Sequence, residues 1–180
     1  MEALRDHGQS RKYFHDLEGY NGRLDALQAG ILQAKLAHLK SWNEQRRYKA
    51  AEYNRLLSDC DALALPLEPS WSRGVYHLYV IRASDREGMM SHLKESGIGT
   101  AIHYPIPLHL QKAYLALNYS RGDLPVAERV APEILSLPLF PHLAVAQQAR
   151  VAKEILVFAS KNHKAQEMEE DSLAPAAKGA

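Results

Sequence analysis

The chain has 180 residues, with 22 Lys and Arg against 21 Asp and Glu, so its formal net charge is +1 at pH 7. This balance argues against a nucleic-acid-binding or acidic-membrane-binding protein, because such proteins concentrate Lys and Arg. Cys60 is the only cysteine, which excludes a disulfide framework and favours a reducing compartment. No apolar stretch approaches the about 20 residues of a membrane span, and no signal peptide is evident. We expect a cytoplasmic protein.

The first sixty residues predict a loop followed by two helices. Residues 1–20 are polar and rich in turn formers, which is typical of a loop. Residues 23–40 contain no proline, and their large apolar side chains recur at helical spacing. These side chains are Leu24, Leu27, Ile31, Leu32, Leu36 and Leu39. A second helix is expected over residues 41–58. The first helix is apolar over so much of its surface that it needs neighbours on more than one side.

The middle of the chain predicts a strand, a helix and a second strand. Residues 75–81 are rich in β-branched and aromatic side chains and form the best strand candidate. Asp85 can cap a short helix that runs through Leu93 and ends at Gly97. Residues 98–104 follow as a second strand. This order within about thirty residues is typical of an α/β or α+β unit.

Prolines punctuate the sequence after residue 104, so only short elements are expected there. Short helical pieces are predicted at 108–117 and 126–134. Residues 144–160 repeat apolar side chains at helical spacing and predict a final amphipathic helix. Residues 164–180 are acidic and then alanine-rich, without an apolar period, and predict a disordered tail.

One candidate site lies just before the long apolar helix, in residues 19–23. A helix start offers unpaired N–H groups and a partial positive charge, to which Asn21 adds an amide and Arg23 a guanidinium. Together these groups would suit a phosphate. The alternative is that Asn21 is only a helix N-cap and Arg23 only a surface charge.

A second candidate site is the segment that begins with His103 and Tyr104 and reaches His109. Two imidazoles and a phenol at the end of a strand can converge on a ligand. The alternative is a turn fixed by two prolines, with both histidines satisfied internally. A metal site with His77 as third ligand is least favoured, since no carboxylate or cysteine lies nearby in sequence. His77 itself is expected to be a packed strand residue, and we predict no metal.

Five segments in a fixed order carry a family resemblance. They are residues 5–9, 19–32, 76–80, 97–105 and 135–139. Together they resemble the C-terminal part of the DegT/DnrJ/EryC1/StrS aminotransferases, and the resemblance covers about residues 4–163. It implies a type I aminotransferase fold, of which this chain would be the small C-terminal α/β (α+β) domain preceded by long linking helices.

The resemblance also implies domain boundaries. Residues 1–22 would be a loop from the end of the large domain, and residues 23–60 would be linking and interface helices. Residues 61–163 would be the small C-terminal domain, followed by the tail 164–180.

The family uses pyridoxal 5'-phosphate to transfer an amino group, usually from glutamate, to a keto-sugar nucleotide, as in polysaccharide biosynthesis. In the family, the lysine that forms the Schiff base lies before the segment matching 5–9, so this chain would lack it. The resemblance thus implies no catalytic residue here and a fragment that is inactive alone. Two alternatives stay open: a non-catalytic dimerising or regulatory module, and a free-standing nucleotide-sugar binder.

The resemblance assigns roles to four residues. Asn21 would reach across a homodimer to the cofactor phosphate of the neighbouring subunit, and Arg23 would do likewise. His103 and Tyr104 would line the substrate pocket. The expected partners are a second copy of the chain or a protein that carries the N-terminal large domain. In an isolated chain, much of the apolar face of the first helix would be exposed to solvent.

Overall fold

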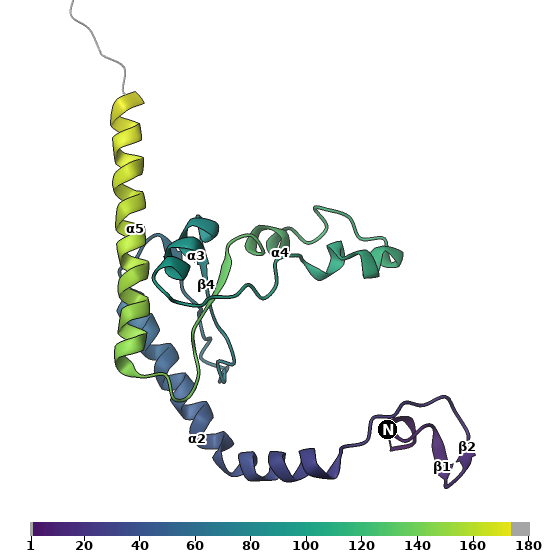
Figure 1. Cartoon of the computed structure of the whole chain (residues 1–180). Coiled ribbons are helices and arrows are strands. Elements are labelled where there is room, and N and C mark those ends of the chain that lie inside the picture. Colours follow the sequence, from purple (N-terminus) through teal and green to yellow (C-terminus); the bar gives the residue numbers. More distant parts are fainter. Residues whose placement is uncertain (1, 174–180) are drawn as a thin grey trace, which may run out of the picture. The chain divides into compact units, whose positions relative to one another are not determined.

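The computed structural model describes residues 2–173 of the chain (Figure 1). Two compact units divide at Trp42 and Asn43, within the range predicted to hold the linking helices. The first unit contains helix α1 (Glu2–Arg5) and an antiparallel hairpin of β1 (Gln9–Arg11) and β2 (Phe14–His15). Residues 1–20, predicted to be a loop, therefore hold short regular elements.

Helix α2 (Ala26–Leu57) is one continuous helix of 32 residues, where two helices were predicted. The sequence around Ser41 contains neither proline nor glycine, so nothing interrupts the hydrogen bonding of the helix. Its N-terminus is capped by Asp25, whose Oδ1 accepts hydrogen bonds from the backbone N–H groups of Leu27 at 2.8 Å and Gln28 at 3.3 Å. Its first half belongs to the first unit and its second half to the second.

The first half of α2 and the residues just before it expose their large apolar side chains. These side chains are between 45% and 75% exposed: Leu24, Leu27, Ile31, Leu32, Leu36 and Leu39. We call this set the α2 apolar face. Its exposure agrees with the expectation that the chain alone leaves this face in water.

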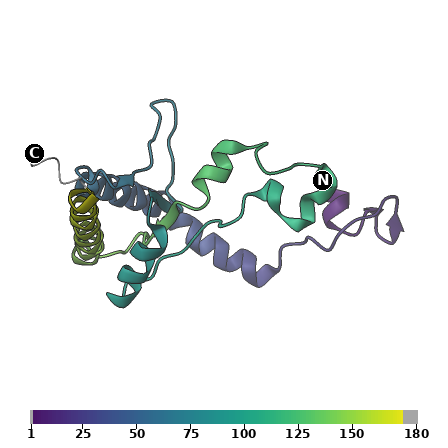
Figure 2. The same cartoon turned by 90° about the horizontal axis from the view of Figure 1, so that it is seen from above.

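The second unit is built on a three-stranded antiparallel sheet in the order β3-β4-β5. Its strands are β3 (Leu63–Ala64), β4 (Tyr79–Ala83) and β5 (Ile134–Leu137). Leu63 pairs with Ala83, and Tyr79 pairs with Leu137. The core of this unit combines buried side chains of the sheet and of three helices, α2, α3 (Arg86–Glu95) and α5 (Val145–Leu173). It includes Ala50, Tyr53, Leu57, Tyr79, Ile81, Leu93, Leu135, Leu137 and Ile155. Figures 1 and 2 show α5 next to the second half of α2.

Three further predicted elements differ from the structure. The strand predicted at 75–81 is β4, which begins at Tyr79, because the backbone of Tyr76 has a φ of 48° and is not extended. The strand predicted at 98–104 is reduced to a single bridge between Ala101 and Ser136, since glycines precede it and Pro105 follows. The helix predicted at 126–134 is α4 (Pro125–Val130), and its last predicted residue starts β5.

The remaining helices were predicted more closely. Helix α3 (Arg86–Glu95) follows Asp85, whose side chain accepts from the N–H of Gly88 as expected of a cap. The piece predicted at 108–117 consists of two 3-10 turns, η1 (Leu108–Leu110) and η2 (Lys112–Leu117). Helix α5 (Val145–Leu173) continues past residue 160, so residues 164–173, predicted to be disordered, are helical. The rest of the predicted tail, 174–180, lies outside the described residues.

The described helices are too short or too polar to cross a membrane.

The long connection between β3 and β4 contacts α2 through the carboxylate of Glu68, as well as through an ion pair of Arg73 with Glu44. Glu68 accepts hydrogen bonds from Arg47 Nη1 at 2.8 Å, from the N–H of Gly74 at 2.6 Å and from the Tyr76 hydroxyl at 2.9 Å. The hydrogen bond from Arg47, with help from the other two donors, lowers the pKa of Glu68 from 4.5 to about 2. The ionised carboxylate therefore stabilises the fold.

Replacing Glu68 with glutamine tests this attachment. A folded-state pKa below the unfolded value stabilises the fold above pH 4.5, and the gain is lost as the pH falls towards about 2. Glu68→Gln should be less stable than the wild type at neutral pH, and its stability should fall less steeply with acid. Urea denaturation across this pH range measures both effects. Glu95→Gln, an exposed change on α3, should keep the wild-type pH dependence, and a Glu68→Gln curve parallel to the wild type would contradict the attachment.

Candidate functional site

The segment that carries Asn21 is anchored by its backbone. The N–H of Tyr20 donates to Leu4 O at 2.7 Å, and the N–H of Gly22 donates to Arg5 O at 2.8 Å. Asn21 also forms a backbone bridge with Asp6. Its side chain is exposed, and within the described part of the chain its amide has no hydrogen-bond partner. The structure thus fixes the position of Asn21 while leaving its amide open to a ligand.

Arg23 is placed in the same unit with only a weak internal partner. Its Nε lies 3.7 Å from Asp6 Oδ1, and the two side chains are 66% and 42% exposed. Such a long, solvent-exposed ion pair contributes little. Arg23 and Arg5 line one cavity of about 500 Å³, together with the carboxylates of Glu2 and Asp6. The guanidinium of Arg23 is therefore available to an anion.

The start of α2 does not contribute to this site as the sequence predicted. The helix begins at Ala26, three residues beyond Arg23, and its first N–H groups donate to Asp25. A carboxylate in that position occupies the donors and repels a phosphate. The prediction that helix N–H groups complete the socket is wrong, and so is the alternative that Asn21 caps the helix. The donors that remain are an amide and a guanidinium, which fit the phosphate of a cofactor.

In the second candidate segment, contacts with Ser136 and Tyr104 fix the position of His103. His103 Nδ1 lies 2.8 Å from Ser136 Oγ, and the half-buried imidazole meets the Tyr104 ring edge to face, with centroids 5.4 Å apart. Tyr104 is 71% exposed and lines an apolar cavity of about 520 Å³ with Ile106 and Leu108 among its neighbours. Tyr104 thus borders a space that a ligand can enter, and His103 lies against Tyr104 without lining that cavity itself.

His109 does not join His103. It is 7% exposed, and its Nε2 lies 3.0 Å from Glu128 Oε1. Glu128 also accepts from the N–H of Gly122, and the hydrogen bond to His109 is the main cause that lowers the pKa of this carboxyl. The expected convergence of two imidazoles is wrong, and for His109 the internally satisfied alternative holds.

His77 departs from its prediction. It lies two residues before β4 and is exposed, so it is not a packed strand residue. Among the described residues, no group of three or more His, Cys, Asp or Glu could hold a metal ion.

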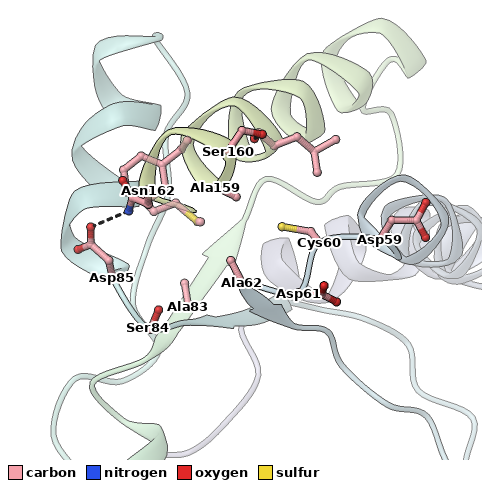
Figure 3. Close-up of a pocket in the computed structure, with 13 residues that line it drawn as sticks. Asp59, Cys60, Asp61, Ala62, Ala83, Ser84, Asp85, Ala159, Ser160 and Asn162 are labelled. Carbon is pink, nitrogen blue, oxygen red and sulfur yellow. Dashed lines mark hydrogen bonds between the residues drawn. The ribbon is translucent and has the colours of Figure 1, made fainter. Parts of the chain in front are cut away.

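A further cavity, of about 450 Å³, was missed by sequence reasoning (Figure 3). It brings together residues 59–62, 83–85 and 156–162, which share no local motif. Asp85, which caps α3, also accepts from Asn162 Nδ2 at 3.2 Å. Cys60 is buried there, and burial raises the pKa of its thiol, so this cysteine is a poor nucleophile.

Solved structures identify the class of protein to which this fold belongs. Streptomyces venezuelae DesV matches with a TM-score of 0.83 and 41% identity, over 87% of this chain and 42% of that chain. A DegT DnrJ EryC1 StrS aminotransferase from Brucella abortus matches with a TM-score of 0.80 and 36% identity, over 88% of this chain and 42% of that one. NtdA from Bacillus subtilis, solved with bound PMP, matches with a TM-score of 0.76 and 28% identity, over 88% and 38%. The fold is that of the aminotransferases, as the sequence predicted.

Residues 1–156 match the DegT/DnrJ/EryC1/StrS aminotransferase family, and the chain belongs to this family. A pleiotropic regulatory protein of Geobacillus stearothermophilus is 47% identical over 158 residues, which are 87% of this chain and 42% of that protein. The dTDP-3-amino-3,4,6-trideoxy-alpha-D-glucose transaminase of Streptomyces venezuelae is 40% identical over 161 residues, 89% of this chain and 42% of that enzyme. The predicted family is thus confirmed. Its members are pyridoxal-phosphate-dependent aminotransferases, and this chain spans about two fifths of the relatives' length.

Proposed function

We propose that this chain is the C-terminal part of a pyridoxal-phosphate-dependent aminotransferase that acts on keto-sugar nucleotides with an amino-acid donor. The family match over residues 1–156 carries the proposal. Relatives named as sugar-nucleotide aminotransferases support it, among them the UDP-N-acetyl-3-dehydro-alpha-D-glucosamine 3-aminotransferase of Acidithiobacillus ferrooxidans, which is 41% identical over 155 residues. The single cysteine favours a reducing compartment such as the cytoplasm.

Asn21 and Arg23 hold the phosphate of the cofactor in this proposal. The anchored backbone of residues 20–22 presents the amide, and the weakly paired guanidinium adds a charge-assisted donor. The cofactor, when bound, supplies the electron sink that transfer of an amino group requires. Because both side chains are exposed, they can reach the phosphate of a cofactor that the large domain of a neighbouring subunit holds.

His103 and Tyr104 line the substrate pocket in the same proposal. An imidazole and a phenol can both donate to sugar hydroxyls and phosphate oxygens, and the apolar cavity beside Tyr104 can accept the less polar face of a sugar.

The lysine that holds the cofactor is proposed to lie outside this chain, on a large domain that precedes the segment 5–9. The α2 apolar face supports association with such a domain or with a second copy. Exposed apolar side chains lose contact with water when a partner covers them, which favours association.

Joining the chain to the N-terminal part of the S. venezuelae transaminase tests the function. The joined protein should aminate a keto-sugar nucleotide with glutamate, and borohydride with pyridoxal 5'-phosphate should add the cofactor's mass to it. The 180-residue chain alone should do neither. If borohydride linked the cofactor to one particular lysine of the 180-residue chain alone, the proposal that the lysine lies outside this chain would be contradicted.

A second candidate is a non-catalytic regulatory module that dimerises with an intact relative. The name of the Geobacillus stearothermophilus relative, a pleiotropic regulatory protein, favours it. In that case the joined protein should stay inactive, and the chain should instead change the activity of an intact transaminase when the two are mixed.

A further inference from the structure

Ser136 is the polar exception in a buried apolar strand. It is 4% exposed and lies in β5 between Leu135 and Leu137, both of which belong to the core. Because side chains alternate along a strand, Ser136 points to the opposite face from its two neighbours. A buried hydroxyl needs a hydrogen-bond partner. Its partner within the described part of the chain is the imidazole of His103.

The backbone fixes the two residues against each other. Ser136 pairs with Val80 on one side of β5 and with Ala101 on the other. The N–H of Ser136 donates to Ala101 O at 2.8 Å, and the N–H of Ala101 donates back to Ser136 O at 3.2 Å. His103 follows Ala101 by two residues, so the bridge between Ala101 and Ser136 places the imidazole of His103 next to the Ser136 hydroxyl. The 2.8 Å between Nδ1 and Oγ is an ordinary hydrogen-bond length.

The tautomer of His103 decides which partner donates in this contact. When the Ser136 hydroxyl donates to Nδ1, its own buried hydrogen is satisfied and the hydrogen of the neutral imidazole lies on Nε2. Within the described part of the chain, Nε2 has no hydrogen-bond partner, and the ring is half-buried beside the exposed Tyr104. The orientation of the ring therefore depends on a residue that a ligand cannot reach.

We propose that Ser136 is a positioning residue: its hydroxyl holds Nδ1 of His103, so that the Nε2–H is presented as a donor to a phosphate or hydroxyl oxygen of the nucleotide sugar. The claim that Nε2–H of His103 binds the nucleotide sugar rests on the proposed function. The claim that Ser136 orients His103 does not rest on it, so an experiment can contradict either claim without the other.

Nitrogen NMR of the imidazole side chains tests the contact on the ¹⁵N-labelled 180-residue chain at a pH where the ring is neutral, with His103→Gln to assign the signals. The wild type should show two well-separated ring nitrogens, with the hydrogen on Nε2. In Ser136→Ala the two signals should move towards each other as the tautomers mix. Ser136→Thr keeps a hydroxyl and suits a strand, so it should restore the wild-type signals. Circular dichroism checks that both variants fold. Unchanged His103 signals in folded Ser136→Ala would overturn the proposal.

Titration with dTDP-glucose tests the presented donor in the protein joined to the N-terminal part of the S. venezuelae transaminase, a relative named for a dTDP sugar. Ser136→Ala should weaken binding about five-fold, the factor that corresponds to one ordinary hydrogen bond, and Ser136→Thr should recover it. If neither the wild type nor the variants bind the probe, the substrate-binding role of His103 fails and with it the proposed function. Equal affinity of wild type and Ser136→Ala would overturn the positioning role alone.

Discussion

Replacing Tyr53 with alanine is expected to lower the free energy of unfolding by about 3–5 kcal/mol, the range found when large buried aromatic side chains are truncated. Tyr53 lies in α2, is 0% exposed and stacks on Tyr79 with ring centroids 4.9 Å apart. Its hydroxyl donates to Pro138 O at 2.9 Å, just beyond β5. The side chain therefore joins the helix to two strands of the sheet, and its removal leaves a cavity and an unpaired carbonyl.

Urea denaturation of Tyr53→Ala measures this loss, and Tyr48→Ala is its matched control. Tyr48 lies on the same helix, five residues earlier, but is 66% exposed, so its truncation should change stability by less than about 0.5 kcal/mol. Tyr53→Phe should lose only the hydroxyl contact, about 1 kcal/mol. Equal losses for Tyr48→Ala and Tyr53→Ala would show that the core is not where the structure places it.

The long helices were the most predictable elements because their signal is spread over many residues. The apolar spacing in 23–40 and 144–160 identified α2 and α5, although their ends were missed. Short elements were predicted poorly because long-range contacts decide them. The four residues of β5 form a strand since β4 is available beside them, and no local pattern distinguishes such a short apolar run from part of a helix.

In the candidate sites, too, features set by local sequence were predictable and features set by long-range contacts were not. Asn21 and Arg23 could be selected from the sequence because an amide and a guanidinium suit an anion wherever the helix begins. The capping role of Asp25 was not recognised, although aspartate is as favoured at that position as asparagine. Ser136 could not be found from the sequence, since 33 residues separate it from His103 and only the sheet brings the two together. The contact between His109 and Glu128 could not be found from the sequence either, and it removes His109 from the residues expected to contact a ligand.

The second large effect is expected at Asn21. A hydrogen bond to a charged group contributes about 1.5–3 kcal/mol, so Asn21→Ala should weaken binding of pyridoxal 5'-phosphate by about 10- to 150-fold. The backbone of residues 20–22 is held by its own hydrogen bonds, so the substitution should leave the fold intact. Gln33→Ala removes an exposed amide from α2 and should leave cofactor affinity unchanged.

The dissociation constant of pyridoxal 5'-phosphate measures this effect directly, in the protein that joins this chain to the N-terminal part of the S. venezuelae transaminase. Asn21→Ala should bind the cofactor weakly and Gln33→Ala should bind it with wild-type affinity, with both proteins folded. Wild-type affinity in folded Asn21→Ala would contradict the claim that this chain holds the cofactor phosphate through Asn21.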